Sequence, residues 1–554
     1  MSTLIEWPAN LRGARPSPPS QGVRKKLFLA DVCVAALSIA IYLVWIDHFR
    51  FRGTLADDDL YRMLRGLLDG ACSGTRFASS LHYGKAFSFG YISATYSFVN
   101  SRILQDPHRL IALMNAVGFW SIAVGAVCFW TSLWLLYGAR RATIAIALFI
   151  FSPILLEQGT SGHAILTAFA FFSAASILLF LPVRGFRAVV CAASGSVMLL
   201  VALTMRADIV LAFPFLVFAP ANYRSTSLFV KSSLLRSLGP GLAFVGFFLL
   251  KHMYVDSAAQ HGTNLHDFFG SYYKLSHIPT GIVICFLGCG IATVLVGIWS
   301  AIRIVGAARA SSPRSERNLE FLRASTGPLS LILPALAFWI ANPAPARHFF
   351  LCSAGIAILA ALLISSIPLP RWIPSVYILT LGIVLANQAL GALSGRVILH
   401  YYHFKIIAVA GQPRVMPHVP IGTSAGFHAA VQQEMWAGDA FAERIRGSCD
   451  ARTIVVTDHY PQLTSQIYGW PGHWIAKEGR FHQSPTITAT NGTRNIVFVS
   501  EHEEWPQDSA AQLLADPDFL DYRLVRDPDT LSIFDTAVIP PSRTVHFGCS
   551  HATI

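Results

Sequence analysis

Long apolar runs constrain this chain more than any other feature of its sequence. Between residues 27 and 394 they follow one another with short polar connections. Many approach the ~20 residues that an α-helix needs to cross a bilayer. We therefore predict a polytopic α-helical membrane protein with about 11 transmembrane helices. The runs are 27–47, 109–137, 142–157, 161–181, 187–204, 207–221, 234–254, 278–303, 327–342, 347–367 and 371–394.

The composition excludes an ordinary soluble enzyme, a disordered chain and a disulfide scaffold. Hydrophobic residues make up 53% of the 554 residues and charged residues only 13%, against the ~25% charged residues of a typical soluble domain. The net charge of +12 comes from short basic clusters between the apolar runs. This is the distribution found in membrane proteins, so we predict a lipid environment and no nucleic-acid partner.

Two features leave the number of spans open. Several runs are short and would have to form tightly coupled hairpins. The segment 84–104 is aromatic and rich in serine, with little Leu, Ile or Val, and we interpret it as interfacial or re-entrant. If it crosses the membrane, the total rises to about 12 or 13 and the later connections change sides.

The basic residues of the short connections assign the two sides of the membrane. With residues 24–26 in the cytoplasm and 84–104 not spanning, the inner connections are much richer in Arg and Lys than the outer ones, as the positive-inside rule requires. All 19 His then fall on the outer side or at outer span ends. The inner residues are Arg140, Arg141, Arg184, Arg187, Arg224, Lys231, Arg236, Arg303, Arg309, Arg314, Arg317, Arg323 and Arg371, and the outer ones are Arg206, Lys251, Lys274 and Arg347.

These features divide the chain into three parts. Residues 1–26 form a cytoplasmic N-terminal segment, and residues 27–394 form the transmembrane domain, with a large outer loop at 48–108. Residues 395–554 differ sharply in composition and are predicted to fold as a soluble extracytoplasmic α/β domain. Its strand-like runs are 453–457, 495–499 and 531–534, and Val431, Met435 and Phe441 mark a helix-like stretch before them.

The sharpest chemical feature is the acidic sequence Asp57-Asp58-Asp59-Leu60-Tyr61, about ten residues beyond the first span. The sequence 62–70 that follows has an apolar face and predicts a short amphipathic helix on the membrane surface. One of the acids could simply cap this helix. Three adjacent carboxylates repel one another, however, and raise one another's pKa unless a cation offsets them. The cluster therefore favours a functional site.

Further polar residues stand at the predicted outer ends of separate spans. Ionisable groups at such positions are costly and point to function. Arg206 could instead pair with Asp208 or with a lipid headgroup. Acids and bases from five outer elements could nevertheless converge on one cavity. These residues are His82, Tyr83, Lys85, Glu157, His163, Arg206, Asp208, Arg347 and His348.

The pattern resembles the GT-C superfamily of membrane glycosyltransferases. Its members begin with one span, place an acidic motif in a large first outer loop with juxtamembrane helices, and often end in a soluble outer domain. The matching residues here are Asp58-Asp59-Leu60-Tyr61 and Arg347-His348, where His stands in place of the family's common Tyr.

The resemblance implies transfer of a sugar, with inversion, from a polyprenyl-phosphate donor to a glycan, lipid or protein acceptor at the outer face. An Asp would act as general base, fixed cations would meet the leaving phosphate, and the acidic motif allows a divalent metal such as Mg or Mn. The implied catalytic residues are Asp57, Asp58 and Asp59; the donor-phosphate residues are Arg206, Arg347, Lys85 and His348; the substrate-binding residues are Tyr61, His82, Tyr83, Glu157, His163 and Asp208.

Two other functions fit a polytopic protein of this kind. A secondary transporter is one, although we find no internal repeat. Another outer-face transferase, such as an acyltransferase or a glycan ligase, is the second. High Arg and Ala and low Lys favour the bacterial inner membrane, with the N-terminus in the cytoplasm and the C-terminal domain in the periplasm.

Overall fold

A computed structural model gives the architecture of the chain. It describes the helices with their short connections, residue 91, and seven strands. The described residues are 21–49, 91, 107–160, 162–183, 185–219, 226–254, 273–309, 316–341, 346–367, 373–402, 407–409, 412–414, 453–457, 473–476, 495–500, 522–526 and 532–536.

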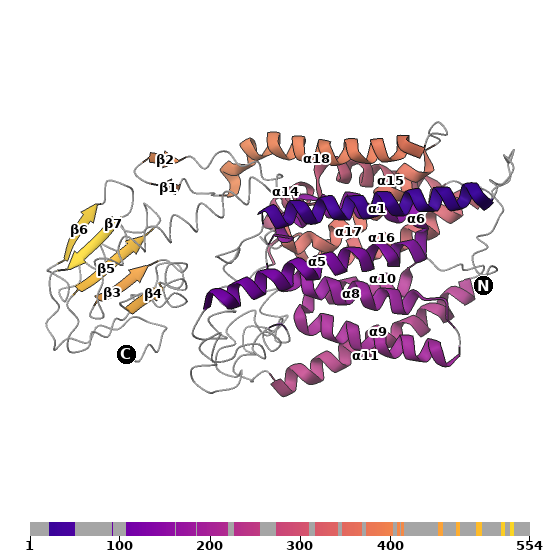
Figure 1. Cartoon of the computed structure of the whole chain (residues 1–554), viewed down its shortest axis with the longest axis horizontal. Helices are drawn as coiled ribbons and strands as arrows, with labels where there is room; N and C mark the ends of the chain where they lie inside the picture. Colours follow the sequence, from indigo (N-terminus) through magenta and orange to yellow (C-terminus); the bar gives the residue numbers. More distant parts are fainter. Residues whose placement is uncertain are drawn as a thin grey trace.

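The helices run lengthwise through one bundle (Figure 1). Large apolar side chains such as Val44, Trp120 and Leu242 are exposed on its outer surface, as expected where lipid replaces water. The helices are α1 (Gln21–Phe49), α5 (Pro107–Tyr137), α6 (Ala139–Ile150), α7 (Pro153–Gln158), α8 (Ala164–Phe180), α9 (Phe186–Met205), α10 (Phe213–Phe218), α11 (Thr226–Tyr254), α14 (Ile278–Cys289), α15 (Ile291–Arg309), α16 (Glu316–Trp339), α17 (Phe350–Ser366) and α18 (Ile373–Tyr402), with short 3₁₀ helices η2 (Ala207–Ala212), η3 (Leu275–His277) and η4 (Ala346–Phe349).

The described part of every predicted apolar run is mostly helical, but four runs divide into two helices. Run 142–157 divides into α6 and α7, run 207–221 into η2 and α10, run 278–303 into α14 and α15, and run 347–367 into η4 and α17. Within the described residues, four helices are long and apolar enough to span a membrane, or five if α14 and α15 count as one bent span. The total of about 11 spans therefore stays a prediction.

Helix α17 occupies the centre of the bundle. It packs against α6, α15 and α16, and nearly all of its residues are buried. Phe350, at its start, meets Phe149 and Phe169 edge-on at ring-centroid distances of 5.4 and 5.0 Å. Such aromatic contacts add to the packing that holds helices together where the surrounding lipid is as apolar as the side chains.

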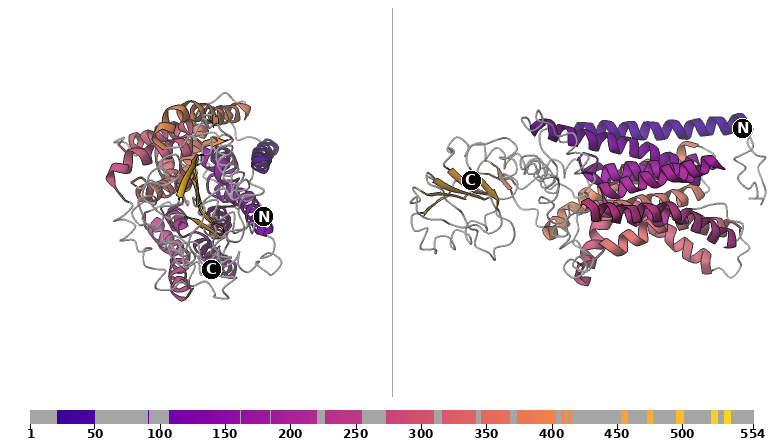
Figure 2. Two further views of the ribbon diagram at one scale, coloured as in Figure 1. Left: turned by 90° about the vertical axis from the view of Figure 1, so that its left-hand side faces the viewer. Right: turned by 90° about the horizontal axis from the view of Figure 1, so that it is seen from below.

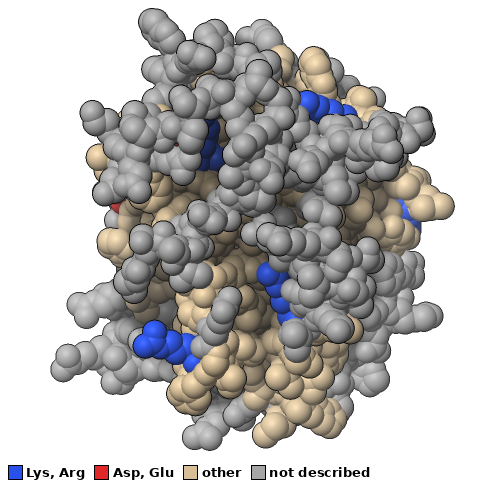
Figure 3. Space-filling view, turned by 90° about the vertical axis from the view of Figure 1, so that its right-hand side faces the viewer, with Lys and Arg blue, Asp and Glu red and all other residues tan. Residues whose placement is uncertain are grey.

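Several arginine side chains hold neighbouring helices together at one end of the bundle, which we call the basic end. At the basic end, Arg141 Nε donates to Ser365 Oγ at 3.2 Å and Arg303 Nη1 donates to Ser366 Oγ at 2.7 Å. Arg236 Nη1 donates to the carbonyl of Ala219 at 3.1 Å. Figure 3 looks onto this end and shows separate patches of Arg and Lys on its face. Arg141, Arg236 and Arg303 belong to the predicted inner connections, so the alternation of the helices agrees with the predicted grouping of the loops.

The strands lie beyond the opposite end of the bundle, which we call the sheet end (Figures 1 and 2). Strands β4 (His473–Ala476), β3 (Thr453–Thr457), β5 (Asn495–Ser500), β7 (Ser532–Thr536) and β6 (Tyr522–Arg526) form one sheet in that order. The first three are parallel to one another, and β7 is antiparallel to both neighbours. A separate hairpin pairs β1 (Ile407–Val409) with β2 (Gln412–Arg414).

The predicted strand-like runs coincide with β3, β5 and β7. The predicted helix-like stretch at Val431, Met435 and Phe441 lies outside the described residues. The α/β character of residues 395–554 therefore stays a prediction.

Candidate functional site

The turn between α7 and α8 is the first component of a polar cluster at the sheet end. His163 caps α8, and its Nδ1 accepts a hydrogen bond from the backbone N–H of Ile165 at 3.2 Å. Two tyrosines from other segments hold this region: Tyr42 donates to the carbonyl of Leu155 in α7, and Tyr91 donates to the carbonyl of Gly162 in the turn, each at 2.7 Å. His163 is therefore fixed in position by several independent contacts.

Glycine is required in this turn because the backbone of α5 lies against it. A methyl group at Gly162 would stand 2.7 Å from the carbonyl oxygen of Met114. No real Cβ tolerates that distance, so the close approach of the turn to α5 depends on glycine.

The second component is the junction of α9 and η2. Arg206 adopts an extended backbone between them, and its Nε donates to both carboxylate oxygens of Asp208, at 3.2 and 3.1 Å. The side chains are mostly buried, with 13% and 16% exposed. The sequence analysis kept a local Arg206–Asp208 pair open, and the structure contains it. Because the pair uses Nε, it orients the guanidinium and directs Nη1 toward His163.

The third component is η4, which carries Arg347 and His348 at the start of α17. The His348 ring rests on the Trp339 ring at 3.9 Å between centroids. This contact joins the end of α16 to η4 and orients the imidazole.

These three components meet at His163. Arg206 Nη1 lies 3.4 Å from His163 Nε2. Burial lowers the pKa of His163 well below its ordinary value, and the charges of Arg206, Arg347 and His348 lower it further. The imidazole is therefore neutral near pH 7.

The tautomer of His163 follows from its capping contact. Its Nδ1 accepts from a backbone N–H, so the single proton of the neutral ring is on Nε2. The contact with Arg206 Nη1 consequently places two N–H donors side by side. An acceptor atom lying to one side of the pair, about 3 Å from each nitrogen, would satisfy both donors.

The cluster concentrates positive charge and N–H donors, an arrangement that favours an anion. Helices α8 and α17 both begin here, and each adds the partial positive charge of a helix N-terminus. Among the described residues no group of three or more His, Cys, Asp or Glu side chains is arranged to hold a metal ion.

The structure brings five predicted site residues together: His163, Arg206, Asp208, Arg347 and His348. Glu157 lies in the neighbouring helix α7, but its side chain is outside what the structure describes. The remaining predicted residues also lie outside the described residues. They are Asp57, Asp58, Asp59, Tyr61, His82, Tyr83 and Lys85.

Three contributors to the site were not predicted. Tyr91 holds the histidine turn, Trp339 supports His348, and Gly162 allows the turn to approach α5. The sequence Gly159-Thr160-Ser161-Gly162-His163 carries the only local signal, because two glycines beside a histidine between apolar helices indicate close packing.

Comparison with known proteins places the fold. The sequence matches no protein-family model and no curated protein. The structure is similar to ArnT from Cupriavidus metallidurans in the apo state, with a TM-score of 0.55 and 14% sequence identity, over 93% of this chain and 98% of ArnT. The same enzyme bound to undecaprenyl phosphate gives a TM-score of 0.52 and 13% identity, over 91% and 97% of the two chains.

A more distant similarity is to the archaeal oligosaccharyltransferase AglB from Archaeoglobus fulgidus. The TM-score is 0.47 and the identity 11%, over 84% of this chain and 69% of AglB. The chain therefore shares the fold of ArnT. This confirms, at the level of fold, the resemblance seen in the sequence.

Proposed function

We propose that this protein is an inverting membrane glycosyltransferase that takes its sugar from a polyprenyl-phosphate donor. The fold supports a transferase of this class, and ArnT, which shares the fold, binds undecaprenyl phosphate. The acceptor would be a glycan, lipid or protein hydroxyl at the outer face of the membrane.

The observation that carries the proposal is the pair of neighbouring donors at His163 Nε2 and Arg206 Nη1, 3.4 Å apart. Arg347 and His348 stand close enough to act electrostatically on the same histidine. A phosphate oxygen to one side of the pair, about 3 Å from each nitrogen, would accept from both and would screen the positive charges from one another. The position at a bundle end suits a phosphate at the membrane surface.

The leaving group makes this cluster useful for catalysis. When the acceptor oxygen attacks the anomeric carbon, the bond from that carbon to the phosphate oxygen breaks and its electron pair stays on the phosphate. Fixed cations and N–H donors stabilise the developing negative charge. No general acid is needed, because a lipid phosphate leaves as a stable anion.

The base would come from the acidic motif. Asp58 or Asp59 would take the proton of the acceptor hydroxyl while its oxygen attacks, and attack from the face opposite the phosphate inverts the anomeric centre. Lys85 would add a further cation to the phosphate site. Residues 395–554 would bind the acceptor in the periplasm of a bacterial inner-membrane enzyme.

The test is release of polyprenyl phosphate from a panel of polyprenyl-phosphate sugars by the purified protein. Slow transfer to water should occur with the correct donor even without the acceptor. Arg206→Gln and the double variant Asp58→Asn/Asp59→Asn should each abolish the release. Arg187→Gln, on an exposed arginine at the start of α9, is the matched control and should retain it.

No release by a folded wild-type protein from any donor would contradict the proposal. Equal release by wild type and the Asp58→Asn/Asp59→Asn variant would show that the acidic motif is not the base.

One structural observation favours a second candidate. Helices α14 and α15 meet at a bend of 104°, and helices broken within the membrane are common in secondary transporters. Substrate counterflow in proteoliposomes would support transport, whereas donor cleavage without counterflow would exclude it.

A further inference from the structure

Helix α14 contacts two segments close to Arg347 and His348: the end of α16, and η4 itself. Near its start, Gly281 packs directly on the backbone of Ile340, so closely that an added methyl group would overlap the Ile340 carbonyl. The neighbouring Ala341 carbonyl accepts from the backbone N–H of Lys274 at 2.9 Å, just before η3 and α14. The start of α14 is therefore fixed against the end of α16.

The other end of α14 touches η4. The Cys289 thiol donates to the carbonyl of Phe349, the last residue of η4, at 3.9 Å, and both residues are buried. Helix α14 thus contacts the residue next to each partner of the Trp339–His348 ring contact: Ile340 beside Trp339, and Phe349 beside His348. A shift of α14 would therefore change the distance between the two rings.

Helix α18 holds the break that follows α14. Gly290 has φ of +90°, a conformation that a side chain would disfavour, and an added methyl group there would meet the Asn387 amide at 2.6 Å. Asn387 Oδ1 accepts from the backbone N–H of Thr293 at 3.0 Å, and its Nδ2 donates to Thr293 Oγ1 at 2.7 Å. Asn387 of α18 therefore satisfies an N–H in the first turn of α15 that has no partner within its own helix.

We propose that α14 positions the phosphate-binding groups of η4, and that Gly281 and Asn387 are positioning residues for Arg347 and His348. Gly281 allows α14 to approach the end of α16, and Asn387 holds the break so that α14 keeps its direction. The proposal rests on the proposed function, because the ligand served by η4 is the lipid phosphate. Neither residue belongs to the cluster around His163.

A purely structural role predicts a different result. If α14 only fills space, Gly281→Ala would lower thermal stability and leave the affinity of any folded protein for the phosphate unchanged. If α14 positions η4, the affinity would fall in protein that is still folded, because small displacements of charged groups weaken their contacts strongly.

The first experiment measures binding of undecaprenyl phosphate to purified Gly281→Ala protein. We expect an affinity about ten-fold lower or worse, with correct insertion and a cooperative thermal transition. Gly382→Ala is the matched control, because Gly382 lies in α18 with open space around its Cα, and it should bind as wild type does. Equal affinities of the two variants would overturn the proposal.

A second pair of variants tests the far end of α14. Asn387→Ala removes the support of the α14–α15 break and should weaken binding several-fold. Thr380→Val, in the same helix, removes only a hydrogen bond to the helix's own Val376 carbonyl, so its affinity should not change. Equal loss in both variants would assign the effect to α18 in general and would contradict a specific role of Asn387.

A cryo-EM structure of Gly281→Ala separates failure of this inference from failure of the proposed function. Loss of the Trp339–His348 contact in this variant, with the contact kept in Gly382→Ala, would support the positioning role even if wild type does not bind undecaprenyl phosphate. An unchanged contact with α14 displaced would overturn the positioning role, whatever the outcome for the proposed function.

Discussion

At the scale of single residues, His163 combines two tasks that substitutions can separate. Its Nδ1 caps α8, while its Nε2–H faces Arg206. Asparagine is a good helix N-cap but cannot present a donor at the same place. The two tasks therefore call for two different variants.

His163→Asn should weaken binding of undecaprenyl phosphate while leaving the unfolding temperature close to that of wild type. His163→Ala should weaken binding and also lower stability, by about 1 kcal/mol for the lost cap. Thermal unfolding in detergent and lipid-phosphate binding measure the two effects. Unchanged binding in His163→Asn would remove His163 from the phosphate site.

The lowered pKa of His163 predicts a pH dependence of stability. The histidine of the unfolded chain titrates near its ordinary value of 6.5, whereas the buried, folded one stays neutral to lower pH. Below about pH 6.5 the unfolded state therefore binds more protons, and the folded state loses stability as the pH falls. Above that value the group makes no pH-dependent contribution.

Unfolding temperatures of wild type and His163→Asn between pH 7.5 and 5.5 measure this contribution. The wild-type temperature should fall more steeply with decreasing pH than that of the variant. Parallel curves would show that His163 does not carry the effect. The comparison is made without ligand, because a bound anion would favour the protonated ring.

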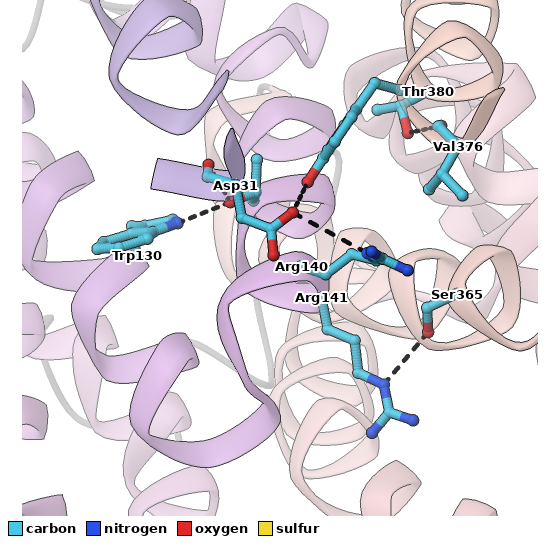
Figure 4. Close-up of polar contacts among 9 residues, drawn as sticks. Asp31, Trp130, Arg140, Arg141, Ser365, Val376 and Thr380 are labelled. Carbon is cyan, nitrogen blue, oxygen red and sulfur yellow. Dashed lines mark hydrogen bonds and ion pairs between the residues drawn. The ribbon is translucent and has the colours of Figure 1, made fainter. Parts of the chain in front are cut away.

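At the scale of helices, a polar cluster around the buried Asp31 carboxylate joins α1 to α18 near the basic end (Figure 4). The Asp31 carboxylate of α1 accepts from the Tyr377 hydroxyl of α18, and Arg140 Nε of α6 lies 3.9 Å from it. Thr143 Oγ1 donates to the Asp31 carbonyl at 3.0 Å and accepts from Trp130 Nε1 at 3.1 Å. The cluster therefore ties α1, α5, α6 and α18 together, far from the candidate site.

Tyr377→Phe should lower the stability of the protein by about 1–3 kcal/mol, because it leaves a buried carboxylate without its hydroxyl donor. Binding of undecaprenyl phosphate should not change. Thermal unfolding in detergent measures the effect, with Thr380→Val as the control on the same helix. A loss of lipid-phosphate affinity without a loss of stability would contradict a structural role for this cluster.

Much of this level of structure could be predicted from the sequence. Apolar runs locate the helices, because a chain in lipid must satisfy its backbone hydrogen bonds within the helix itself. In the C-terminal part, β-branched residues mark strand β3 at the predicted residues 453–457. The breaks were harder to predict. The bend at Gly290 depends on a contact between Thr293 and Asn387, which are 94 residues apart in the sequence, and no local pattern carries that information.

The same distinction applies to the site. Successive spans cross the membrane in alternating directions. This alternation predicts that His163, Arg206 and Arg347 lie at the same end of the bundle, because each stands at an outer end of a predicted span. The Trp339 platform and the tautomer of His163 come from packing and capping contacts. These depend on three-dimensional neighbours and could not be predicted from the order of the residues.

At the scale of the whole molecule, the fold places a basic end and a candidate phosphate site at opposite ends of one bundle. The positive-inside rule then predicts that the basic end faces the cytoplasm and the site the outer face. It also predicts that residues 395–554 lie outside, since α18 ends at the sheet end (Figure 1).

Reporter fusions test this orientation. Alkaline phosphatase, which is active only outside the cytoplasm, should be active when fused after residue 402 and inactive when fused after residue 183. A fluorescent protein that folds only in the cytoplasm should give the opposite pattern. Reversed activities would place the candidate site in the cytoplasm and contradict the proposed use of an outer-leaflet donor.

The central claim is that the cluster around His163 and Arg206 binds the phosphate of a polyprenyl lipid. Equilibrium binding of undecaprenyl phosphate to wild type, Arg206→Gln and Arg187→Gln tests it most directly. We predict saturable binding to wild type and Arg187→Gln and a loss of about ten-fold or more in Arg206→Gln, since a charge-assisted hydrogen bond to phosphate is worth about 1.5–3 kcal/mol. Equal affinities of all three proteins, or no saturable binding to folded wild type, would contradict the claim.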